Sequence, residues 1–446
     1  MIDVATVGIF GAGYAGLVTG ACFAELGHLV VVRDVVPEKV AELEAGRVPF
    51  HEPGLPELIA RNRERVRFTL DASEVASESQ YLFICVDTPP TYSGEADLSR
   101  VWTVLEELPP LDRRAILVMK STVPVGTGEN VRAGLDARGL DRIGYVSNPE
   151  FLAEGSAVRD FLQPDRIVIG AFEEEDADAV EELHRGLEAP VVHTDVASAE
   201  MIKLASNAFL GTRISFINEI ANVCELVGAD VEDVARGMGL DKRIGTRYLK
   251  PGIGFGGSCF PKDISFLKLL AGNSGYHFQL LNAVMEVNEL QKRRLVGKLQ
   301  KHLGTLRGKT VALLGLSFKP NTDDLREAPS VVLASRLLAE GADVRAWDPV
   351  ADAHDVLRGV AICASVLEAV TDADAAVIVT EWDELRSLLT PDVREAMRSA
   401  LVVDGRNLLD PEAARAAGFV YEAVGRPSSP LANLPEAADP ASSVRI

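Results

Sequence analysis

The sequence predicts an α/β protein in which two parallel-sheet domains are joined by a central helical domain containing a long helix. Short apolar segments of strand length recur near both ends of the 446-residue chain, and the second set repeats the order of the first. The stretch between them lacks strand signals and has helical periodicity. This length also exceeds what one hydrophobic core supports. We therefore expect domains over residues 1–197, 198–303 and 304–426, followed by a flexible tail over 427–446.

The first domain begins with the elements of a dinucleotide-binding (Rossmann) unit. The apolar run 4–10 is typical of a buried parallel strand, 17–26 of a helix and 29–32 of a second strand. Between the first strand and the helix lies the pattern Gly-x-Gly-x-x-Gly over residues 11–16. With an acidic residue about 20 positions on, this is the dinucleotide fingerprint.

Each residue of the fingerprint has a physical role. Gly11 permits the tight turn, Gly13 lets the backbone approach the pyrophosphate, and Gly16 allows close helix packing. The free N–H groups of the helix N-terminus face the phosphates. Asp34 accepts from a ribose 2′-hydroxyl and repels a 2′-phosphate, which favours NAD over NADP, although the neighbouring Arg33 weakens this preference.

Two further apolar strands, 81–86 and 115–119, are each followed by a threonine. In a doubly wound sheet, ligands lie at the carboxyl ends of the strands. Thr88 and Thr122 are thus placed to line the cofactor crevice. Capping of a turn by each hydroxyl explains the same positions equally well.

The central domain is expected to contain one helix over Ala199–Leu226, about 40 Å long. Such a helix can join two lobes and provide a dimer surface. Lys203 and Asn207 lie four residues apart and so share a face. A surface ion pair between Glu200 and Lys203 is the alternative. Asn207 lies among apolar neighbours, however, where an amide is costly unless it has partners.

The third domain repeats the strand pattern over 310–315, 343–348, 374–380 and 400–404. Its first turn lacks the glycine fingerprint and carries Lys319 instead. This difference predicts a Rossmann-like domain that binds a phosphorylated ligand other than a dinucleotide.

Charge and cysteine content exclude several classes of protein. The formal net charge of −21 argues against a nucleic-acid partner or an anionic membrane surface. No apolar run reaches the length of a membrane span, and the N-terminus shows no leader. The five cysteines and seven histidines are scattered without metal-ligand spacing. We expect a reduced, cytoplasmic protein with no metal site.

Cys259 is the residue that points most directly to covalent chemistry. It follows Gly254-Phe-Gly-Gly-Ser258 and precedes Lys262 and Asp263. A cation nearby favours the nucleophilic thiolate. The alternative is a buried structural cysteine. Two carboxylates further upstream, Glu150 and Glu154, could each act as a base for water or cap a helix.

Several motifs together resemble the UDP-glucose/GDP-mannose dehydrogenase family over about residues 4–425. Besides the glycine fingerprint, these motifs are Ser-Thr-Val-Pro-Val-Gly-Thr at 121–127, Asn-Pro-Glu-Phe-Leu at 148–152, Glu-Met-Ile-Lys-Leu-Ala-Ser-Asn-Ala-Phe at 200–209, the segment 248–263, the segment 315–329, and Asp-Gly-Arg-Asn at 404–407. The resemblance implies a four-electron oxidation of a sugar C6 alcohol to a carboxylate with NAD. Phe260 resembles the UDP-glucose branch of the family more than the GDP-mannose branch. UDP-glucose is therefore the expected substrate, giving UDP-glucuronate for polysaccharide biosynthesis.

The resemblance also implies the roles of individual residues. Cys259 would form a hemithioacetal and then a thioester, and Lys203 with Asn207 would stabilise oxyanions. Asp263 with a water would accept the alcohol proton, with Lys203 as the alternative base, and Glu150 with Thr122 would direct the hydrolytic water. Cofactor contacts are assigned to Gly11, Gly13, Tyr14, Ala15, Gly16, Asp34, Lys39, Thr88, Thr122, Glu154, Lys262 and Arg326. Substrate contacts are assigned to Glu150, Phe151, Leu152, Lys203, Asn207, Arg243, Tyr248, Gly256, Lys262, Lys319 and Arg406.

The chain departs from the family pattern at two residues, and the sequence leaves alternative functions. Asp87 and Ala153 differ from the family pattern and affect only fine cofactor contacts. Oxidation of GDP-mannose by the same mechanism is the nearest alternative. A two-electron 3-hydroxyacid dehydrogenase would need neither the thiol nor the third domain, and a catalytically silent nucleotide-sugar binder is the remaining alternative. The family implies a homodimer, with Arg243 reaching the substrate of the neighbouring subunit.

Overall fold

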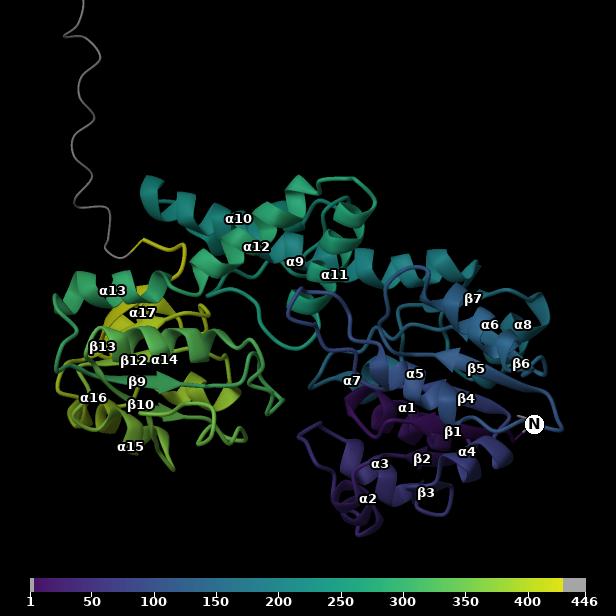
Figure 1. The fold of residues 1–446 in the computed structure, drawn as a ribbon. Coiled ribbons are helices and arrows are strands. Elements are labelled where there is room, and N and C mark those ends of the chain that lie inside the picture. Colours follow the sequence, from purple (N-terminus) through teal and green to yellow (C-terminus); the bar gives the residue numbers. More distant parts are fainter. Residues whose placement is uncertain (1–3, 428–446) are drawn as a thin grey trace, which may run out of the picture. The chain divides into compact units, whose positions relative to one another are not determined.

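The computed structural model describes residues 4–427, which pack into two compact units (Figure 1). The first unit contains the chain up to Gly211, together with Gly256–Asn282 and Lys319–Arg326. The second unit contains Thr212–Phe255, Ala283–Phe318 and the chain from Glu327 onward. The expected tail over 428–446 lies outside the described residues.

The first unit is built on an eight-stranded sheet with the order β3-β2-β1-β4-β5-β6-β7-β8. All neighbouring strands are parallel except β6 and β7, which pair antiparallel. The strands are β1 (Thr6–Phe10), β2 (Leu29–Arg33), β3 (Val66–Thr69), β4 (Tyr81–Ile84), β5 (Ala115–Met119), β6 (Ile143–Ser147), β7 (Ile167–Ala171) and β8 (Val191–Thr194).

Helices cover both faces of this sheet, which explains why its central strands β1, β4 and β5 are apolar on both sides. Val7 and Ile9 of β1 pack in one core, which includes residues of α1, α2, α3, α7 and α8. Phe10 at the end of the same strand packs in the opposite core, against α4, α5 and α6. The helices are α1 (Tyr14–Glu25), α2 (Pro37–Glu44), α3 (Leu55–Arg61), α4 (Ala72–Glu78), α5 (Ser99–Glu107), α6 (Thr127–Ala137), α7 (Ala157–Leu162) and α8 (Glu174–Leu183).

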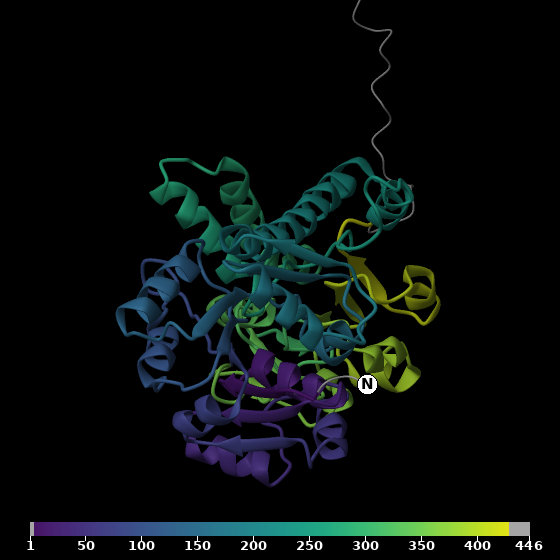
Figure 2. The same cartoon turned by 90° about the vertical axis from the view of Figure 1, so that its right-hand side faces the viewer.

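The long helix expected in the central domain is α9 (Val196–Val227), which Figure 2 shows as one unbroken teal helix. Its 32 residues correspond to about 48 Å. No proline interrupts it, and it is longer than the predicted helix by three residues at its start and one at its end. The other central helices are α10 (Val231–Gly239), α11 (Phe260–Asn273), α12 (Gln279–Gln291) and α13 (Arg294–Leu303).

The second unit contains a six-stranded, fully parallel sheet with the order β11-β10-β9-β12-β13-β14, drawn green to yellow in Figure 1. Its elements are β9 (Thr310–Leu314), α14 (Pro329–Ala339), β10 (Asp343–Trp347), β11 (Ala361–Ile362), α15 (Val366–Val370), β12 (Ala375–Ile378), the 3₁₀ helix η1 (Asp383–Ser387), α16 (Pro391–Ala396), β13 (Leu401–Asp404), α17 (Pro411–Ala416) and β14 (Val420–Ala423).

The predicted fold class is confirmed: two parallel-sheet α/β parts and a helical region with a long helix. The β6–β7 pair and the assignment of residues 319–326 to the first unit were not predicted. Within residues 4–427, no helix combines the length and apolar character needed to cross a membrane.

Candidate active site

The glycine fingerprint forms the turn between β1 and α1, and two of its glycines are required by close backbone contacts. Gly11 has a φ of +104°, and a Cβ there would lie 2.7 Å from the carbonyl oxygen of Cys85. A Cβ on Gly16 would lie 1.9 Å from the carbonyl oxygen of Gly11. Any larger side chain would therefore separate α1 from the strand.

Gly13 differs from the other two because the space beside it is open. The nearest atom to a Cβ built there is Asp87 Oδ1, at 3.7 Å. Gly13 is also the N-cap of α1, and no side chain caps this helix end. A dinucleotide pyrophosphate fits this arrangement, since free N–H groups and an open approach lie at the same point.

Asp34 lies beside the turn, as the fingerprint predicts. Its carboxylate accepts hydrogen bonds from the backbone N–H of Ala12 at 2.9 Å and of Val36 at 3.1 Å. Lys39 Nζ lies 3.0 Å from Asp34 Oδ2. Burial opposes ionisation, but Lys39 and the backbone donors hold the pKa of Asp34 below its usual range. An ionised acceptor at this position suits the ribose hydroxyls of NAD.

The side chains of Tyr14 and Lys39 already have partners near the turn. Tyr14 Oη donates to Glu52 and accepts from the backbone N–H of Gly155. Glu52 also accepts from the N–H of Ala157 at 2.7 Å. Ala15 lies in the first turn of α1. The Tyr14–Glu52 pair joins the turn to the segment that contains Glu154, and no local sequence pattern indicates this contact.

Lys203 and Glu150 form a buried ion pair at the carboxyl end of the sheet. Lys203 Nζ lies 2.7 Å from Glu150 Oε1, and Leu152 N–H donates to the other oxygen. Burial opposes charge on both groups, yet the pKa of Lys203 is raised by Glu150, Asp263 and Cys259. The pKa of Glu150 is lowered, chiefly by Lys203. Both groups are therefore charged at neutral pH.

Glu200 does not pair with Lys203, so the surface ion pair offered as an alternative is absent. Its carboxylate is buried and accepts from the backbone N–H groups of Gly126 and Gly128 at 2.7 and 2.8 Å. Glu200 thus fixes the start of α6. The Lys203 side chain is left to interact with Glu150.

Asn207 and Asp263 join α9 to α11. Asn207 Nδ2 donates to Asp263 Oδ2 at 2.6 Å, and Lys262 Nζ lies 2.9 Å from Asp263 Oδ1. Lys262 Nζ also lies 3.4 Å from Thr88 Oγ1, and that hydroxyl donates to the carbonyl oxygen of Thr122. The two predicted threonines and the predicted catalytic helix residues therefore meet in one place.

Cys259 is the N-cap residue of α11, and it is partly exposed. Burial of its thiol is the largest influence and raises its pKa to about 11, with Glu150 adding to the rise and Lys203 opposing it. As expected of a nearby cation, Lys203 favours the thiolate. The surrounding carboxylates and the loss of solvent outweigh the lysine, so the thiol is protonated at neutral pH.

Glu154 is a second buried carboxylate of the site. It accepts from Ser258 Oγ and from Thr322 Oγ1, both at 3.2 Å, and Arg326 Nη2 lies 3.5 Å away. Burial, followed by the neighbouring Asp324, raises the pKa of Glu154 to about 7. Residues 319–326 thus contribute to the site within the first unit.

Several predicted substrate contacts also lie in the first unit. Phe151 lies between two cations, with Arg166 Cζ 3.5 Å and Lys203 Nζ 5.6 Å from the ring centroid. Leu152 packs against the first core, and Gly256 is buried near the start of α11. Burial lowers the pKa of Lys319, which Glu154 and Cys259 oppose.

Three predicted substrate residues belong to the second unit. Arg243 is exposed and pairs with Asp241 at 2.7 Å, and Tyr248 adopts a positive φ of 60°. Arg406 Nε donates to the carbonyl oxygen of Val379 at 2.7 Å. The structure describes these side chains within that unit, and their contacts with the substrate stay predictions.

Sequence reasoning missed three neighbours of the catalytic residues. Ser258 Oγ lies 3.6 Å from Cys259 Sγ, and Arg166 stacks on Phe151. Lys120 is buried with its Nζ 2.9 Å from Asn148 Oδ1, and burial lowers its pKa to about 8. The position of Lys120, directly after β5 and beside Thr122, was the available signal.

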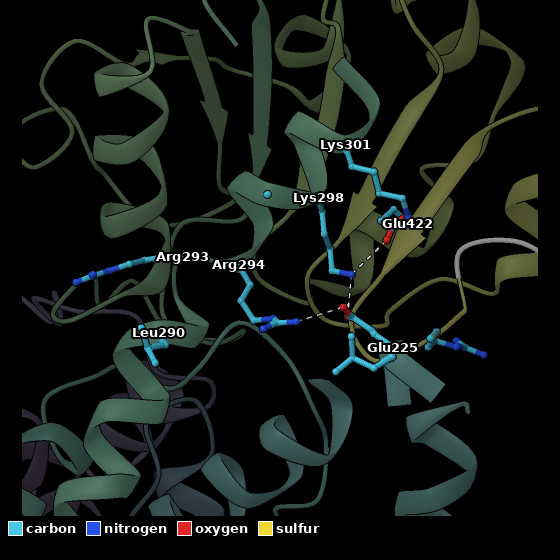
Figure 3. Close-up of a pocket in the computed structure, with 10 residues that line it drawn as sticks. Glu225, Leu290, Arg293, Arg294, Lys298, Lys301 and Glu422 are labelled. Carbon is cyan, nitrogen blue, oxygen red and sulfur yellow. Dashed lines mark hydrogen bonds and ion pairs between the residues drawn. The ribbon is translucent and has the colours of Figure 1, made fainter. Parts of the chain in front are cut away.

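A cavity of about 550 Å³ lies in the second unit, and its lining includes none of the predicted site residues (Figure 3). Lys298 Nζ lies 2.7 Å from Glu225 and 3.2 Å from Glu422, and Arg294 reaches Glu225 at 3.4 Å. Lys301 pairs with Glu422 at 3.0 Å. Since these charges neutralise one another, we assign them to an ion-pair network that joins α9, α13 and β14.

Comparisons with known proteins match all three parts of the chain. Residues 5–188, 197–290 and 312–411 match the NAD binding, central and UDP binding domain models of the UDP-glucose/GDP-mannose dehydrogenase family. The chain is 45% identical to UDP-glucose 6-dehydrogenase TuaD of Bacillus subtilis, covering 95% of this chain and 93% of that protein. It is 47% identical to UDP-glucose 6-dehydrogenase of Pseudomonas aeruginosa, covering 94% and 97%.

A solved structure agrees with these matches. The UDP-glucose dehydrogenase of Pyrobaculum islandicum superposes with a TM-score of 0.88 at 38% identity, covering 95% of this chain and 98% of that chain. The predicted NAD cofactor is supported by the domain match and by the geometry at Gly13 and Asp34. The chain belongs to the UDP-glucose/GDP-mannose dehydrogenase family.

Proposed function

We propose that this chain oxidises the C6 alcohol of UDP-glucose to a carboxylate, giving UDP-glucuronate, with two molecules of NAD⁺ reduced per turnover. The observation that carries the proposal is the grouping of Cys259 with the Lys203–Glu150 ion pair, at the carboxyl end of a sheet that also holds the dinucleotide turn. A thiol is needed only if an aldehyde is oxidised further. The named relatives act on UDP-glucose.

The chemistry requires a nucleophile between two hydride transfers. NAD⁺, when bound at the glycine turn, accepts the hydride in each oxidation. After the first oxidation the aldehyde carbon is attacked by the Cys259 sulfur, which makes a tetrahedral hemithioacetal that can lose a second hydride. The resulting thioester is hydrolysed by water, which releases the acid and restores the thiol.

Lys203 is suited to stabilise the negative charge that develops on the sugar oxygen. It is charged and held rigidly by Glu150, so little reorganisation is needed during the reaction. Asn207 donates to Asp263, which we assign, with a water, as the acceptor of the alcohol proton. Lys203 as the first base would require loss of a proton whose pKa is raised, so Asp263 is the better-supported assignment.

Glu150 is suited to orient the hydrolytic water, together with Thr122. The pKa of Glu150 is lowered, so its carboxylate is ionised and can accept a hydrogen bond from water. Thr122 follows β5, and its carbonyl oxygen is held by Thr88. The remaining cofactor contacts proposed are Tyr14, Ala15, Lys39, Glu154, Lys262 and Arg326.

The substrate would be held by aromatic and cationic groups from both parts of the chain. Within the chain, Glu150 is followed directly by Phe151 and Leu152, and Gly256 lies three residues before Cys259. The charge of Cys259 raises the pKa of Lys319. We propose Arg243, Tyr248 and Arg406 as contacts from the second unit. The UDP binding domain model matches residues 312–411, which supports a UDP-sugar. GDP-mannose stays the alternative substrate.

We further propose a cytoplasmic homodimer formed through α9. Phe209, Phe216 and Val223 lie seven residues apart, so they share a face, and they are 61%, 48% and 52% exposed. A stripe of large apolar side chains at this spacing fits a second copy of the same helix. The proposed domain boundaries are those at 197/198, 303/304 and 426/427.

The decisive experiment measures NADH formed from a panel of UDP- and GDP-sugars. Two equivalents of NADH per UDP-glucose are expected from the intact protein. One equivalent would identify a two-electron dehydrogenase, and preference for GDP-mannose would move the chain to the other branch of the family. Cys259→Ser is expected to abolish the aldehyde-to-acid step before it abolishes binding. Full two-NADH turnover by that variant would contradict the mechanism.

A further inference from the structure

The protonated state of Cys259 raises the question of which group removes the thiol proton. Its pKa of about 11 leaves little thiolate at neutral pH. The nearby carboxylates Glu150 and Asp263 are already assigned to the hydrolytic water and to the alcohol proton; Lys203 lies 2.7 Å from Glu150, and Asn207 donates to Asp263 at 2.6 Å. Neither carboxylate forms a hydrogen bond with the Cys259 sulfur, whose neighbour is Ser258.

Ser258 lies between the thiol and a third carboxylate. Its Oγ lies 3.6 Å from Cys259 Sγ and donates to Glu154 Oε1 at 3.2 Å. The three side chains therefore form a continuous hydrogen-bonded chain of sulfur, hydroxyl and carboxylate, all within the first unit. A hydroxyl can donate and accept at once, which is what transfer of a proton along such a chain requires.

The geometry points to a proton relay in which Ser258 passes the Cys259 thiol proton to Glu154 as the sulfur attacks the aldehyde. This inference rests on the proposed function and adds a base to it. The S–H bond breaks and a C–S bond forms, while the aldehyde oxygen takes the electron pair and becomes an oxyanion beside Lys203. Ser258 gives its own proton to Glu154 and receives the thiol proton, so no atom is oxidised or reduced in this step.

The charges around Glu154 fit the role of proton acceptor at neutral pH. Burial is the largest influence on the pKa of Glu154 and raises it. Asp324 raises this pKa further, while Arg326 and Lys319 lower it, and the resulting value is about 7. Tyr14 is the remaining titratable group that responds to its charge, besides Cys259 itself. Thr322 Oγ1 donates to Oε2 at 3.2 Å, while Oε1 accepts from Ser258 at 3.2 Å and lies 3.5 Å from Arg326 Nη2. A base with a pKa near the working pH is the most efficient one.

The test separates the two halves of the reaction in the full-length protein. Wild type, Ser258→Ala, Ser258→Thr and Glu154→Gln are given either UDP-glucose or its C6 aldehyde, and the first turnover of NADH is followed by stopped flow. Ser258→Ala is expected to slow aldehyde oxidation by about 100-fold while the first hydride transfer from the alcohol changes by less than about threefold. Ser258→Thr, which keeps the hydroxyl, should restore most of the rate.

The matched control is Ser265→Ala, on the same helix, where the hydroxyl donates to the carbonyl oxygen of Pro261 at 2.7 Å. It should leave both halves unchanged. The pH profile for the aldehyde should show an acid limb near pH 7 in wild type that Glu154→Gln removes. A wild-type aldehyde rate in Ser258→Ala, or equal slowing of both halves, would overturn the relay. Failure of wild type to reduce NAD⁺ with either substrate would instead overturn the proposed function.

Discussion

Asn207 on α9 and Asp263 on α11 share a hydrogen bond of 2.6 Å, although 56 residues separate them in the chain. Asp263 is fully buried and Asn207 is 6% exposed. Asp263 lies in the first turn of the helix that Cys259 caps. The bond therefore connects the helix that supplies Lys203 to the helix that supplies the nucleophile.

Asn207→Ala is expected to lower both stability and activity. It leaves Asp263 Oδ2 buried without its amide donor, and an unsatisfied buried polar group costs about 1–3 kcal/mol. The free energy of unfolding, measured with urea, should fall by about that amount, and kcat should fall with it. Asn222→Ala is the control on the same helix, because the hydrogen bonds of Asn222 are long, at 3.3 and 3.4 Å. If Asn207→Ala is as stable and as active as the wild type, the hydrogen bond between Asn207 and Asp263 does not support the site.

The sequence predicts the parts of the site that are local and not those that depend on packing. Gly11, Gly16 and Asp34 are predicted because a strand, a turn and a helix are contiguous. The contact of Glu154 with Thr322 joins residues 168 positions apart, and no pattern in the chain places residues 319–326 in the first unit. Likewise, the thiol state of Cys259 depends on burial, which neighbouring sequence letters do not reveal.

Stability should depend on pH through Glu200. Burial raises its pKa from an ordinary 4.5 to about 7. The folded protein therefore holds the proton more tightly than the unfolded chain, and the stabilisation present below about pH 4.5 is lost as the pH rises to about 7. The difference in unfolding free energy between wild type and Glu200→Gln should fall by up to about 3 kcal/mol over this range.

Urea unfolding at constant ionic strength between pH 4.5 and 8 measures this difference. Above about pH 8 the difference should become constant, because Glu200 is ionised in both states. An increase in the wild-type advantage as the pH rises would show that the carboxylate, stabilised by the Gly126 and Gly128 N–H groups, is the form that the fold favours.

The ion-pair network of the second unit should contribute to stability rather than catalysis. Lys298 is 9% exposed at its side chain and contacts two acids, of which Glu422 is 4% exposed. Lys298→Met leaves those acids with fewer cations, so the free energy of unfolding should fall by about 2–4 kcal/mol. Arg294→Met is the control, since Arg294 is 40% exposed and its loss should cost less than about 1 kcal/mol. Unchanged melting of Lys298→Met would contradict the assignment.

The apolar stripe of α9 should control the oligomeric state. Phe216→Glu places a charge at the centre of the stripe, between Phe209 and Val223. A dimer formed through the stripe would bury this unpaired charge twice, once from each subunit, which is unfavourable. Sedimentation velocity should therefore show a dimer for the wild type and a monomer for the variant. Tyr276→Glu changes an aromatic that lies off this helix and is 65% exposed, against 48% for Phe216, and this variant should stay dimeric. If Phe216→Glu sediments as the wild type does, the stripe is not the dimer interface, because a dimer formed through the stripe would bury the new charge against apolar side chains.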